Sequence, residues 1–205
     1  MRICIVGAGA IGGLLAVRLA ASGEAVTVVA RGAQLEAIEK RGLRLTGLQG
    51  EDIHASPSLA RDLRSIGPQD LVVLGVKAHQ VAPIASDVAD CLAPEGLVLT
   101  AQNGIPWWYF FGHGGSLEGR ALNSVDPGGV IAAHLPIDRV IGSVVYPAAE
   151  IAEPGVIRLI EGNRFSLGEL DNSRTDRLQA ISQVLTNAGF KAPVVTDLRS
   201  EIWTK

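Results

Sequence analysis

The feature that most constrains the fold of this chain is a glycine cluster that directly follows a short apolar segment. Residues 2–6 form an apolar run, as expected for a parallel strand buried on both faces. The sequence GAGAIG occupies residues 7–12, and apolar side chains then recur at helical spacing through residues 10–22. Gly23 can end this helix, and residues 25–30 form a second apolar run. The pattern predicts two parallel strands joined by a right-handed helical crossover.

The glycines have the spacing of the dinucleotide-binding fingerprint, Gly-x-Gly-x-x-Gly. Gly7 permits a tight turn, Gly9 lets the backbone approach a pyrophosphate, and Gly12 allows the helix to pack closely on the strand. Gly13 should make the approach roomier still. Because a helix N-terminus offers unpaired N–H groups and a positive dipole end, phosphates bind there. We therefore predict dinucleotide contacts from the loop residues Gly7, Ala8, Gly9, Ala10, Ile11 and Gly12.

The residue after the second strand distinguishes two dinucleotides. An NAD-specific domain usually carries an acidic residue about 20 residues beyond the glycines, where it binds the ribose 2′-hydroxyl. This chain has Ala30-Arg31-Gly32 there. A guanidinium can bind a 2′-phosphate through charge-assisted hydrogen bonds, whereas a carboxylate would repel it. Arg31 therefore predicts NADP(H) rather than NAD(H) as the cofactor.

The rest of the sequence extends this unit into a larger sheet. Hydrophobic residues make up 47% of the chain and aromatic residues only 4%, so small side chains can let helices pack closely on strands. The expected fold is α/β, with a Rossmann-type, doubly wound and mostly parallel sheet. Residues 106–139 are rich in Gly, Pro and aromatic residues and are predicted to be irregular. Further strands are predicted at 43–46, near Ile53 and at 71–76, 97–100, 140–146, 156–160, 165–168 and 192–195, and further helices at 34–41, 81–92 and 175–188.

Two polar residues follow strands in the second half of the predicted sheet. Lys77 comes after the strand at 71–76, and Asn103 comes after the strand at 97–100. In an open parallel sheet the carboxyl ends of the strands line the ligand crevice. Both residues can therefore face the nicotinamide half of the cofactor, although an exposed lysine and an Asn-Gly turn are also common without any function.

The last residues have the pattern of a helix start. Thr196 or Asp197 can cap the helix. One apolar face then begins with Leu198, Ile202 and Trp203. A helix of fewer than about ten residues is marginal without a partner surface. We therefore expect residues 1–196 to form an NADP-binding Rossmann domain, and residues 197–205 to start the first helix of a truncated C-terminal helical domain that binds the substrate.

Charge and composition argue against several other classes of protein. The net charge is −3 without a long run of one sign, so nucleic-acid binding has no electrostatic support. No apolar stretch reaches about 18 residues, so no membrane span is expected. Cys4 and Cys91 lack the spacing of a metal site, and Cys4 lies in a strand pattern as a buried, reduced thiol. The simplest expectation is a cytoplasmic protein.

An ordered series of motifs resembles the ketopantoate reductase (2-dehydropantoate 2-reductase) family and covers almost the whole chain. The series comprises GAGAIGG at 7–13, Arg31, VKAHQ at 76–80, AQNG at 101–104, VIGSVVYPAAEIAEPGVI at 140–157 and DLRSEIWTK at 197–205. The resemblance implies that NADPH reduces the C2 carbonyl of a 2-ketoacid to a 2-hydroxy acid, with pantoate as the family's product.

The resemblance also implies roles for single residues. Lys205, which ends a W-x-K pattern, would be the general acid that protonates the developing alkoxide, a role that suits an ammonium group. Asn103 would lie between nicotinamide and substrate, Lys77 close to the cofactor, and Ala148 along the cofactor wall. The family's second, helical domain holds the substrate, so this chain should bind cofactor better than it catalyses. A homodimer through that domain is a further expectation.

The long aromatic segment after AQNG departs from the family pattern. Trp107 and Trp108 either cover an exposed end of the sheet or reshape the substrate mouth, and the first interpretation is slightly favoured. Because of this segment, ketopantoate itself is one of several possible 2-ketoacid substrates.

Other functions remain as alternatives. A short-chain dehydrogenase would need Tyr-x-x-x-Lys, which neither Tyr109 nor Tyr146 provides. The four histidines lack metal-like spacing, and no metal site is expected. A β-hydroxyacid dehydrogenase or imine reductase would share the first strands without the terminal W-x-K pattern. A sensor module could bind NADP(H) without catalysing any reaction.

Overall fold

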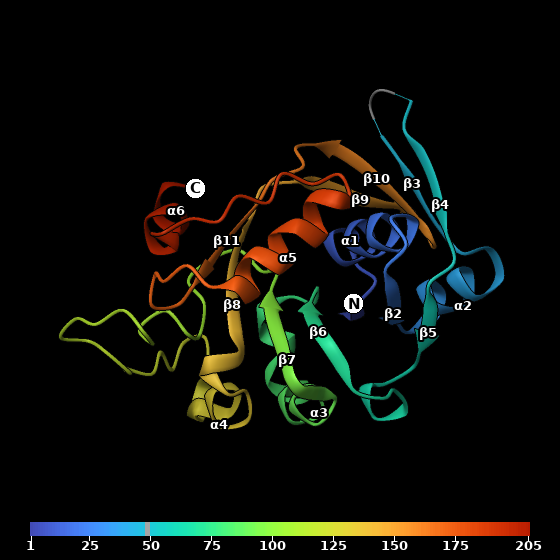
Figure 1. Cartoon of the computed structure of the whole chain (residues 1–205). Coiled ribbons are helices and arrows are strands. Elements are labelled where there is room, and N and C mark those ends of the chain that lie inside the picture. Colours follow the sequence, from blue (N-terminus) through green and yellow to red (C-terminus); the bar gives the residue numbers. More distant parts are fainter. Residues whose placement is uncertain (48–49) are drawn as a thin grey trace.

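A seven-stranded sheet forms the centre of the computed structural model, which describes residues 1–47 and 50–205 (Figure 1). Across the sheet the strands follow the order β11 (Phe165–Glu169), β8 (Val140–Val145), β7 (Leu92–Thr100), β6 (Gln69–Leu74), β1 (Arg2–Val6), β2 (Ala25–Val29) and β5 (Ser58–Ala60). The strands from β8 to β5 are parallel, and β11 pairs antiparallel with β8 at one edge. The mostly parallel sheet predicted from the sequence is therefore confirmed.

The chain winds outward from β1 in both directions, which is the doubly wound arrangement. It runs through β2 to β5 on one side and then through β6 and β7 to β8 on the other. The direction changes between β1 and β6, where the two halves of the sheet meet. In open sheets of this kind, ligands bind outside the carboxyl ends of the strands at that switch point.

Helices cover both faces of the sheet. In Figure 1, α1 (Ala10–Ala21) and α5 (Asp176–Asn187) lie above it, and α3 (Ala85–Asp90) and α4 (Val130–His134) lie below. Buried residues accordingly form two separate apolar clusters, one on each side. The predicted helix at the chain end is α6 (Leu198–Thr204), and α2 (Gly32–Arg41) follows β2. One-turn 3-10 helices occur at Leu63–Ser65, Ala78–Gln80, Ala82–Ile84, Pro127–Gly129 and Ile137–Arg139.

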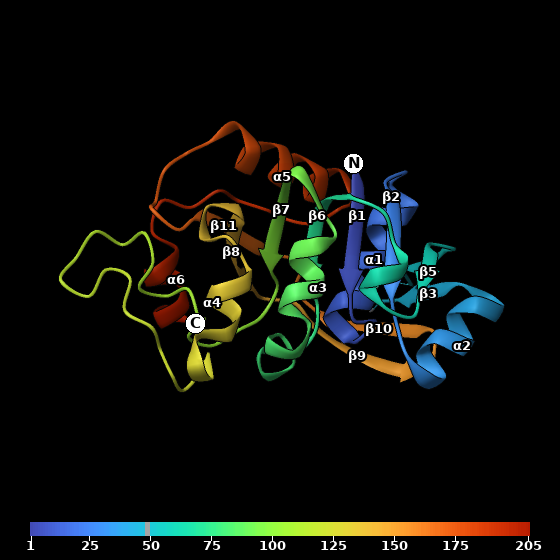
Figure 2. The same ribbon diagram turned by 90° about the horizontal axis from the view of Figure 1, so that it is seen from below.

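A second, smaller sheet packs on α1, and the sequence did not predict it as a separate layer. Its order is β4 (Asp52–Ala55), β3 (Leu43–Thr46), β10 (Val156–Glu161) and β9 (Ala148–Glu153). Figure 2 shows β9 and β10 next to the arrowheads that mark the carboxyl ends of the central strands. Gly13 serves this layer rather than the loop, because a Cβ there would lie 2.7 Å from Cδ1 of Ile157. The expectation that Gly13 widens the loop is therefore corrected.

Some local predictions differ from the structure for identifiable reasons. The helix predicted at 81–92 is divided into a 3-10 turn and α3, because Pro83 lies in the first part and Ile84 leaves helical geometry with φ −117° and ψ 0°. β9 is exposed over most of its length, so its sequence carries little strand signal. The strand predicted at 192–195 is reduced to isolated bridges, one of which joins Leu167 to Val194.

The aromatic segment covers one face of the sheet. Trp107 and Trp108 are 6% and 1% exposed and belong to the cluster beneath the sheet. The Trp108 indole nitrogen donates a hydrogen bond to Thr100 Oγ1 at 3.2 Å. These contacts support the covering interpretation. The segment also contains α4, which the sequence did not predict.

The two thiols are buried, as the strand pattern predicted for Cys4. Burial raises the pKa of Cys4 to about 12 and that of Cys91 to about 11, so both are protonated at neutral pH. Within residues 1–47 and 50–205, none of the helices combines the length and the apolar character needed to cross a membrane.

Candidate active site

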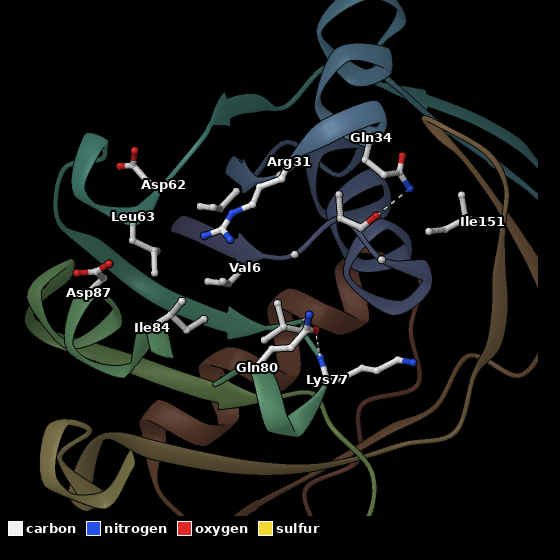
Figure 3. Close-up of a pocket in the computed structure, with 17 residues that line it drawn as sticks. Val6, Arg31, Gln34, Asp62, Leu63, Lys77, Gln80, Ile84, Asp87 and Ile151 are labelled. Atoms are coloured by element: carbon white, nitrogen blue, oxygen red, sulfur yellow. Dashed lines mark hydrogen bonds between the residues drawn. The ribbon is translucent and has the colours of Figure 1, made fainter. Parts of the chain in front are cut away.

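A cavity of about 390 Å³ opens at the carboxyl ends of β1, β2 and β6 (Figure 3). This volume lies within the usual range for small-molecule sites, roughly 300–1,000 Å³. The residues that line it are Val6, Gly7, Ala8, Gly9, Val29, Ala30, Arg31, Gln34, Asp62, Leu63, Gly75, Val76, Lys77, Gln80, Ile84, Asp87 and Ile151. The glycine loop, the end of β2 and the end of β6 therefore share one cavity, at the switch point of the sheet.

The glycine loop is built by backbone-to-backbone packing. A Cβ on Gly12 would lie 1.9 Å from the Gly7 carbonyl oxygen, and a Cβ on Gly75 would lie 2.9 Å from the Gly12 Cα. Gly7 itself has φ +99°, a conformation that favours glycine. The loop, α1 and the end of β6 consequently touch without intervening side chains. Gly75 was not identified from the sequence. Its position directly after β6 is the feature that could have indicated close packing against the loop.

Open space remains over the loop at Gly9. A Cβ there would meet only the Gly75 carbonyl oxygen, at 3.9 Å. In the described part of the chain no side chain caps α1 at this residue, so its first-turn N–H groups have no side-chain cap as a partner. These features fit a pyrophosphate. Gly7, Ala8 and Gly9 line the cavity, while Ala10, Ile11 and Gly12 form the first turn of α1.

Arg31 lies at one end of the cavity together with Asp62 and Leu63 (Figure 3). Asp62 Oδ1 accepts a hydrogen bond from the Ser65 backbone N–H at 2.9 Å. Asp87 also lines this end, and its carboxylate pairs with Arg64 at 2.9 Å. These two acids were not identified from the sequence, because they follow β5 and lie in α3, far along the chain from the glycine loop.

Gln34 connects the glycine loop to the second sheet. Its Nε2 donates to the Ala8 carbonyl at 3.0 Å, and its Oε1 accepts from the Gly155 N–H at 2.7 Å. From the same sheet, Ile151 contributes a 44% exposed side chain to the cavity wall. The wall residue from β9 is thus Ile151, and the predicted Ala148 begins the same strand three residues earlier. The feature of the sequence that could have identified Gln34 as a site residue is its position one helical turn after Arg31.

Lys77 lies at the opposite end of the cavity from Arg31 (Figure 3). Its backbone N–H donates to Gln80 Oε1 at 3.1 Å, which fixes the turn after β6. Next to it, the Gln102 side chain donates to the Val76 carbonyl at 3.0 Å. Gln102 therefore ties the end of β7 to the cavity wall, and it lines a separate small pocket together with Asn103 and Lys205.

Asn103 and Lys205, the two predicted catalytic residues, meet at one backbone group. Asn103 Nδ2 donates to the Val145 carbonyl at 3.0 Å, and the Val145 N–H donates back to Asn103 Oδ1 at 3.1 Å. The Lys205 ammonium donates to the same Val145 carbonyl. Partial burial lowers the pKa of Lys205. Two residues a hundred positions apart are therefore brought together at the end of β8.

The position of Lys205 depends on how α6 is seated. Asp197 caps the helix by accepting from the Ser200 N–H at 2.9 Å. Leu198 is 1% exposed and packs where Gly142 of β8 pairs with Gly168 of β11. A Cβ on Gly142 would lie 2.4 Å from Cδ2 of Leu198. The capping residue and Leu198 behave as predicted, whereas Trp203 is 71% exposed and lies outside the buried face.

Arg199 fixes the aromatic segment to α6. Its guanidinium donates to the backbone carbonyls of Tyr109, Phe111 and Leu170 at 2.8, 2.7 and 2.6 Å. Burial lowers the pKa of this guanidinium, but three carbonyl acceptors compensate its charge. The sequence did not identify this tether, because its partners are backbone atoms of distant residues.

Comparison with known proteins gives consistent matches. The family model described as ketopantoate reductase PanE/ApbA matches residues 3–172. A 2-dehydropantoate 2-reductase of Mesorhizobium japonicum is 51% identical over the whole chain, which spans 63% of that relative's length. The corresponding protein of Archaeoglobus fulgidus is 30% identical, and the chain spans 59% of its length. A solved 2-dehydropantoate 2-reductase from Geobacter metallireducens has a TM-score of 0.79 at 28% identity, covering 99% of this chain and 60% of its own.

Proposed function

The chain belongs to the ketopantoate reductase family, and from this premise we propose that it takes part in the NADPH-dependent reduction of a 2-ketoacid to a 2-hydroxy acid. One structural observation supports the proposal in addition to membership of the family. The Gln102 side chain joins the end of β7 to the cavity wall at Val76, and the next residue, Asn103, meets Lys205 at the Val145 carbonyl. A cofactor held at the loop would thus have a proton donor at its far end.

The proposed chemistry divides between cofactor and protein. NADPH, when bound, supplies the hydride that reduces the C2 carbon. The Lys205 ammonium stabilises the negative charge that develops on the C2 oxygen and donates a proton to it, which completes the hydroxyl group. Its lowered pKa makes this donation easier than from an ordinary lysine. The lysine then recovers its proton from solvent, so one proton and one hydride are consumed per turnover.

We further propose that Asn103 orients the reacting groups beside Lys205. Its side-chain amide is fixed by two hydrogen bonds to Val145, so it has a single orientation. Lys77 would contact the cofactor from the end of β6, and Ala148 would lie along the cofactor wall on the same strand as Ile151. The substrate class follows from the family; ketopantoate and related 2-ketoacids are the candidates.

Arg31 carries the proposed choice of NADPH over NADH. It follows β2 and lines the cavity, and a guanidinium there would suit a ribose 2′-phosphate. The carboxylates at the same end weaken this assignment, but Asp87 is neutralised by Arg64 and Asp62 is engaged with a backbone N–H. We infer that the positive charge of Arg31 prevails at this end.

The domain organisation is part of the proposal. Residues 1–196 would form the NADP-binding domain, and residues 197–205 would begin the first helix of a helical substrate domain. The support is the greater length of the relatives, of which this chain spans 63% or less in the two sequence matches above. A homodimer formed through that domain would be visible by light scattering of the full-length protein.

A side-by-side fluorescence titration with NADPH and NADH tests the cofactor site. Arg31→Ala should weaken NADPH binding by about 1–3 kcal/mol and leave NADH binding nearly unchanged. Arg61→Ala is the matched control, because Arg61 is an exposed cation nearby that does not line the cavity. Equal losses for both cofactors in Arg31→Ala would refute the 2′-phosphate assignment. Binding of neither cofactor by the unaltered chain would refute the glycine-loop site.

A further inference from the structure

Tyr146, the residue that follows β8, is held by side chains from two other parts of the chain. Its hydroxyl donates to Glu201 Oε2 at 2.9 Å. Arg164 donates to the other carboxylate oxygen of Glu201 at 2.6 Å, and its guanidinium carbon lies 5.0 Å from the centre of the Tyr146 ring. The Lys205 ammonium lies 5.1 Å from the same ring centre. The ring thus has a cation at its face that is also the proposed proton donor.

The two contacts from α6 to Tyr146 lie one helical turn apart. Glu201 precedes Lys205 by four residues, and the Lys205 N–H donates to the Glu201 carbonyl at 3.3 Å. Tyr146 therefore meets the same helix twice, through its hydroxyl at Glu201 and through its ring at Lys205. Arg164 is fixed in turn by a 2.9 Å hydrogen bond to Ser166 Oγ on β11. The ring cannot turn without breaking its bond to Glu201.

We propose that Tyr146 is a positioning residue for Lys205. Its ring face holds the ammonium at the Val145 carbonyl, and its hydroxyl fixes the ring to α6 through Glu201. This inference rests on the proposed role of Lys205 as proton donor. It assigns Tyr146, Glu201 and Arg164 to the support of the reaction, whereas none of them touches the reacting atoms.

The charges around Lys205 determine what the ring does. Tyr146 faces it from the end of β8, Glu201 lies on its own helix, and Arg164 lies beyond the ring at the start of β11. The pair between Arg164 and Glu201 is closed at 2.6 Å, so these two charges largely cancel. Burial and the bond to Glu201 raise the pKa of Tyr146, so its phenol stays neutral at neutral pH. The ring's negative face then attracts the ammonium alongside the Val145 carbonyl, and it favours the charged form.

The test uses the small number of lysines and tyrosines in the chain. Lysines occur only at 40, 77, 191 and 205, so isotope-labelled lysine gives few NMR signals and the Lys205 titration can be followed directly. Tyr146→Leu keeps an apolar side chain but removes the ring face. The titration midpoint of Lys205 should then fall by about half a pH unit, the scale of one cation–π contact. The carboxylate of the last residue is common to all variants.

Two companion variants separate positioning from folding. Tyr146→Phe keeps the ring and loses only the bond to Glu201, so the Lys205 midpoint should stay within about 0.2 pH unit of the original. Tyr109→Leu is the matched control, because Tyr109 also contacts α6 but through Trp203 and Arg199. It should leave the Lys205 midpoint unchanged. Circular dichroism and thermal unfolding show which variants remain folded.

The outcomes are decisive in each direction. An unchanged or raised midpoint in Tyr146→Leu, or an equal fall in Tyr109→Leu, would overturn the proposal. In a full-length protein that reduces a 2-ketoacid, Tyr146→Leu should lower kcat on the order of ten-fold with little change in the KM for NADPH, and Tyr146→Phe should restore most of it. The NMR titration needs no turnover. If the midpoint shifted as expected but no ketoacid were reduced, the proposed function would be rejected. The contact between the Tyr146 ring and Lys205 would still be supported.

Discussion

The two ends of the proposed site, at the glycine loop and at Lys205, are built in different ways. At the glycine-loop end, Gly7 and Gly12 lie five residues apart and pack backbone against backbone. At the Lys205 end, the side chains of Asn103 and Lys205 come from two distant segments, and their common point is the Val145 carbonyl of a third. The first end is a product of local sequence, and the second exists only after the whole chain has folded. Substitutions should therefore affect the two ends in distinguishable ways.

The largest expected effect is at the Lys205 end. Lys205→Ala in a full-length, active protein should lower kcat by about 10²- to 10⁴-fold, the usual contribution of a general acid. The affinity for NADPH should stay nearly constant, because the glycine loop is built independently. Since the pKa of Lys205 is lowered, the activity of the unaltered protein should fall with rising pH, starting below the pH at which an ordinary lysine loses its proton. Steady-state rates across pH measure both effects.

A control for this variant is Lys40→Ala, which removes an exposed lysine from the last turn of α2. It should leave the rate and its pH dependence unchanged. A Lys205→Ala protein that retains full turnover would reject the proton-donor role and favour a module that binds NADP(H) without catalysis.

A second pair of variants addresses the glycine-loop end. In Gly12→Ala the new Cβ would meet the Gly7 carbonyl oxygen, which belongs to the backbone and cannot move aside. The unfolding free energy should fall by at least about 3 kcal/mol, and dinucleotide binding should be lost. In Gly9→Ala the Cβ has open space, so stability should be kept while binding falls. Thermal unfolding and NADPH titration of both proteins check this.

The contrast between the two variants is the critical result. If the Gly9→Ala protein bound NADPH as tightly as the original, the proposal that the pyrophosphate binds at the loop would be rejected. If Gly9→Ala were instead as unstable as Gly12→Ala, the space over Gly9 would be structural rather than a binding site.

The same difference explains how much the sequence could predict. The loop, α1 and the parallel sheet follow from glycine spacing and apolar periodicity, because both are local signals. Arg31 was identified by its distance from the glycines, and the structure brings it into the same cavity. Lys205 was identified only by resemblance, since a terminal lysine carries no local signal of its own. Its environment at Tyr146 and Glu201 depends on contacts across more than fifty residues, which no pattern in this sequence encodes.

The second sheet was missed for a related reason. Its strands β3 and β10 are more than a hundred residues apart and pair in parallel, so neither strand indicates its partner. Asp62 reaches the cavity from the turn after β5, a strand that the sequence did not predict, and Asp87 reaches it from α3. Their positions depend on how those segments pack in the fold. The spacing of apolar residues predicts helices and strands but does not predict this packing.

A smaller effect is expected where α6 is seated on the sheet. In Gly142→Ala the new Cβ would meet Leu198 and Trp108, whose nearest atoms lie 2.4 and 2.7 Å away. The unfolding free energy should fall by about 1–3 kcal/mol, the usual cost of overpacking. Because Leu198 carries α6, Lys205 should be displaced and turnover should fall more than NADPH binding does. Gly67→Ala is the control, since a Cβ there meets nothing within 4 Å.

The smallest effect tests whether the two ends are independent of the second sheet. Gln34→Ala removes the hydrogen bonds to Ala8 and Gly155, so the glycine loop loses its tether to the turn between β9 and β10. The loss should be about 1 kcal/mol of stability and a few-fold in NADPH affinity. Gln183→Ala is the control, because Gln183 bonds only Asn187 on the exposed side of α5. If Gln34→Ala lowered kcat without changing NADPH affinity, the second sheet would act on the Lys205 end, and the separation between the two ends would have to be abandoned.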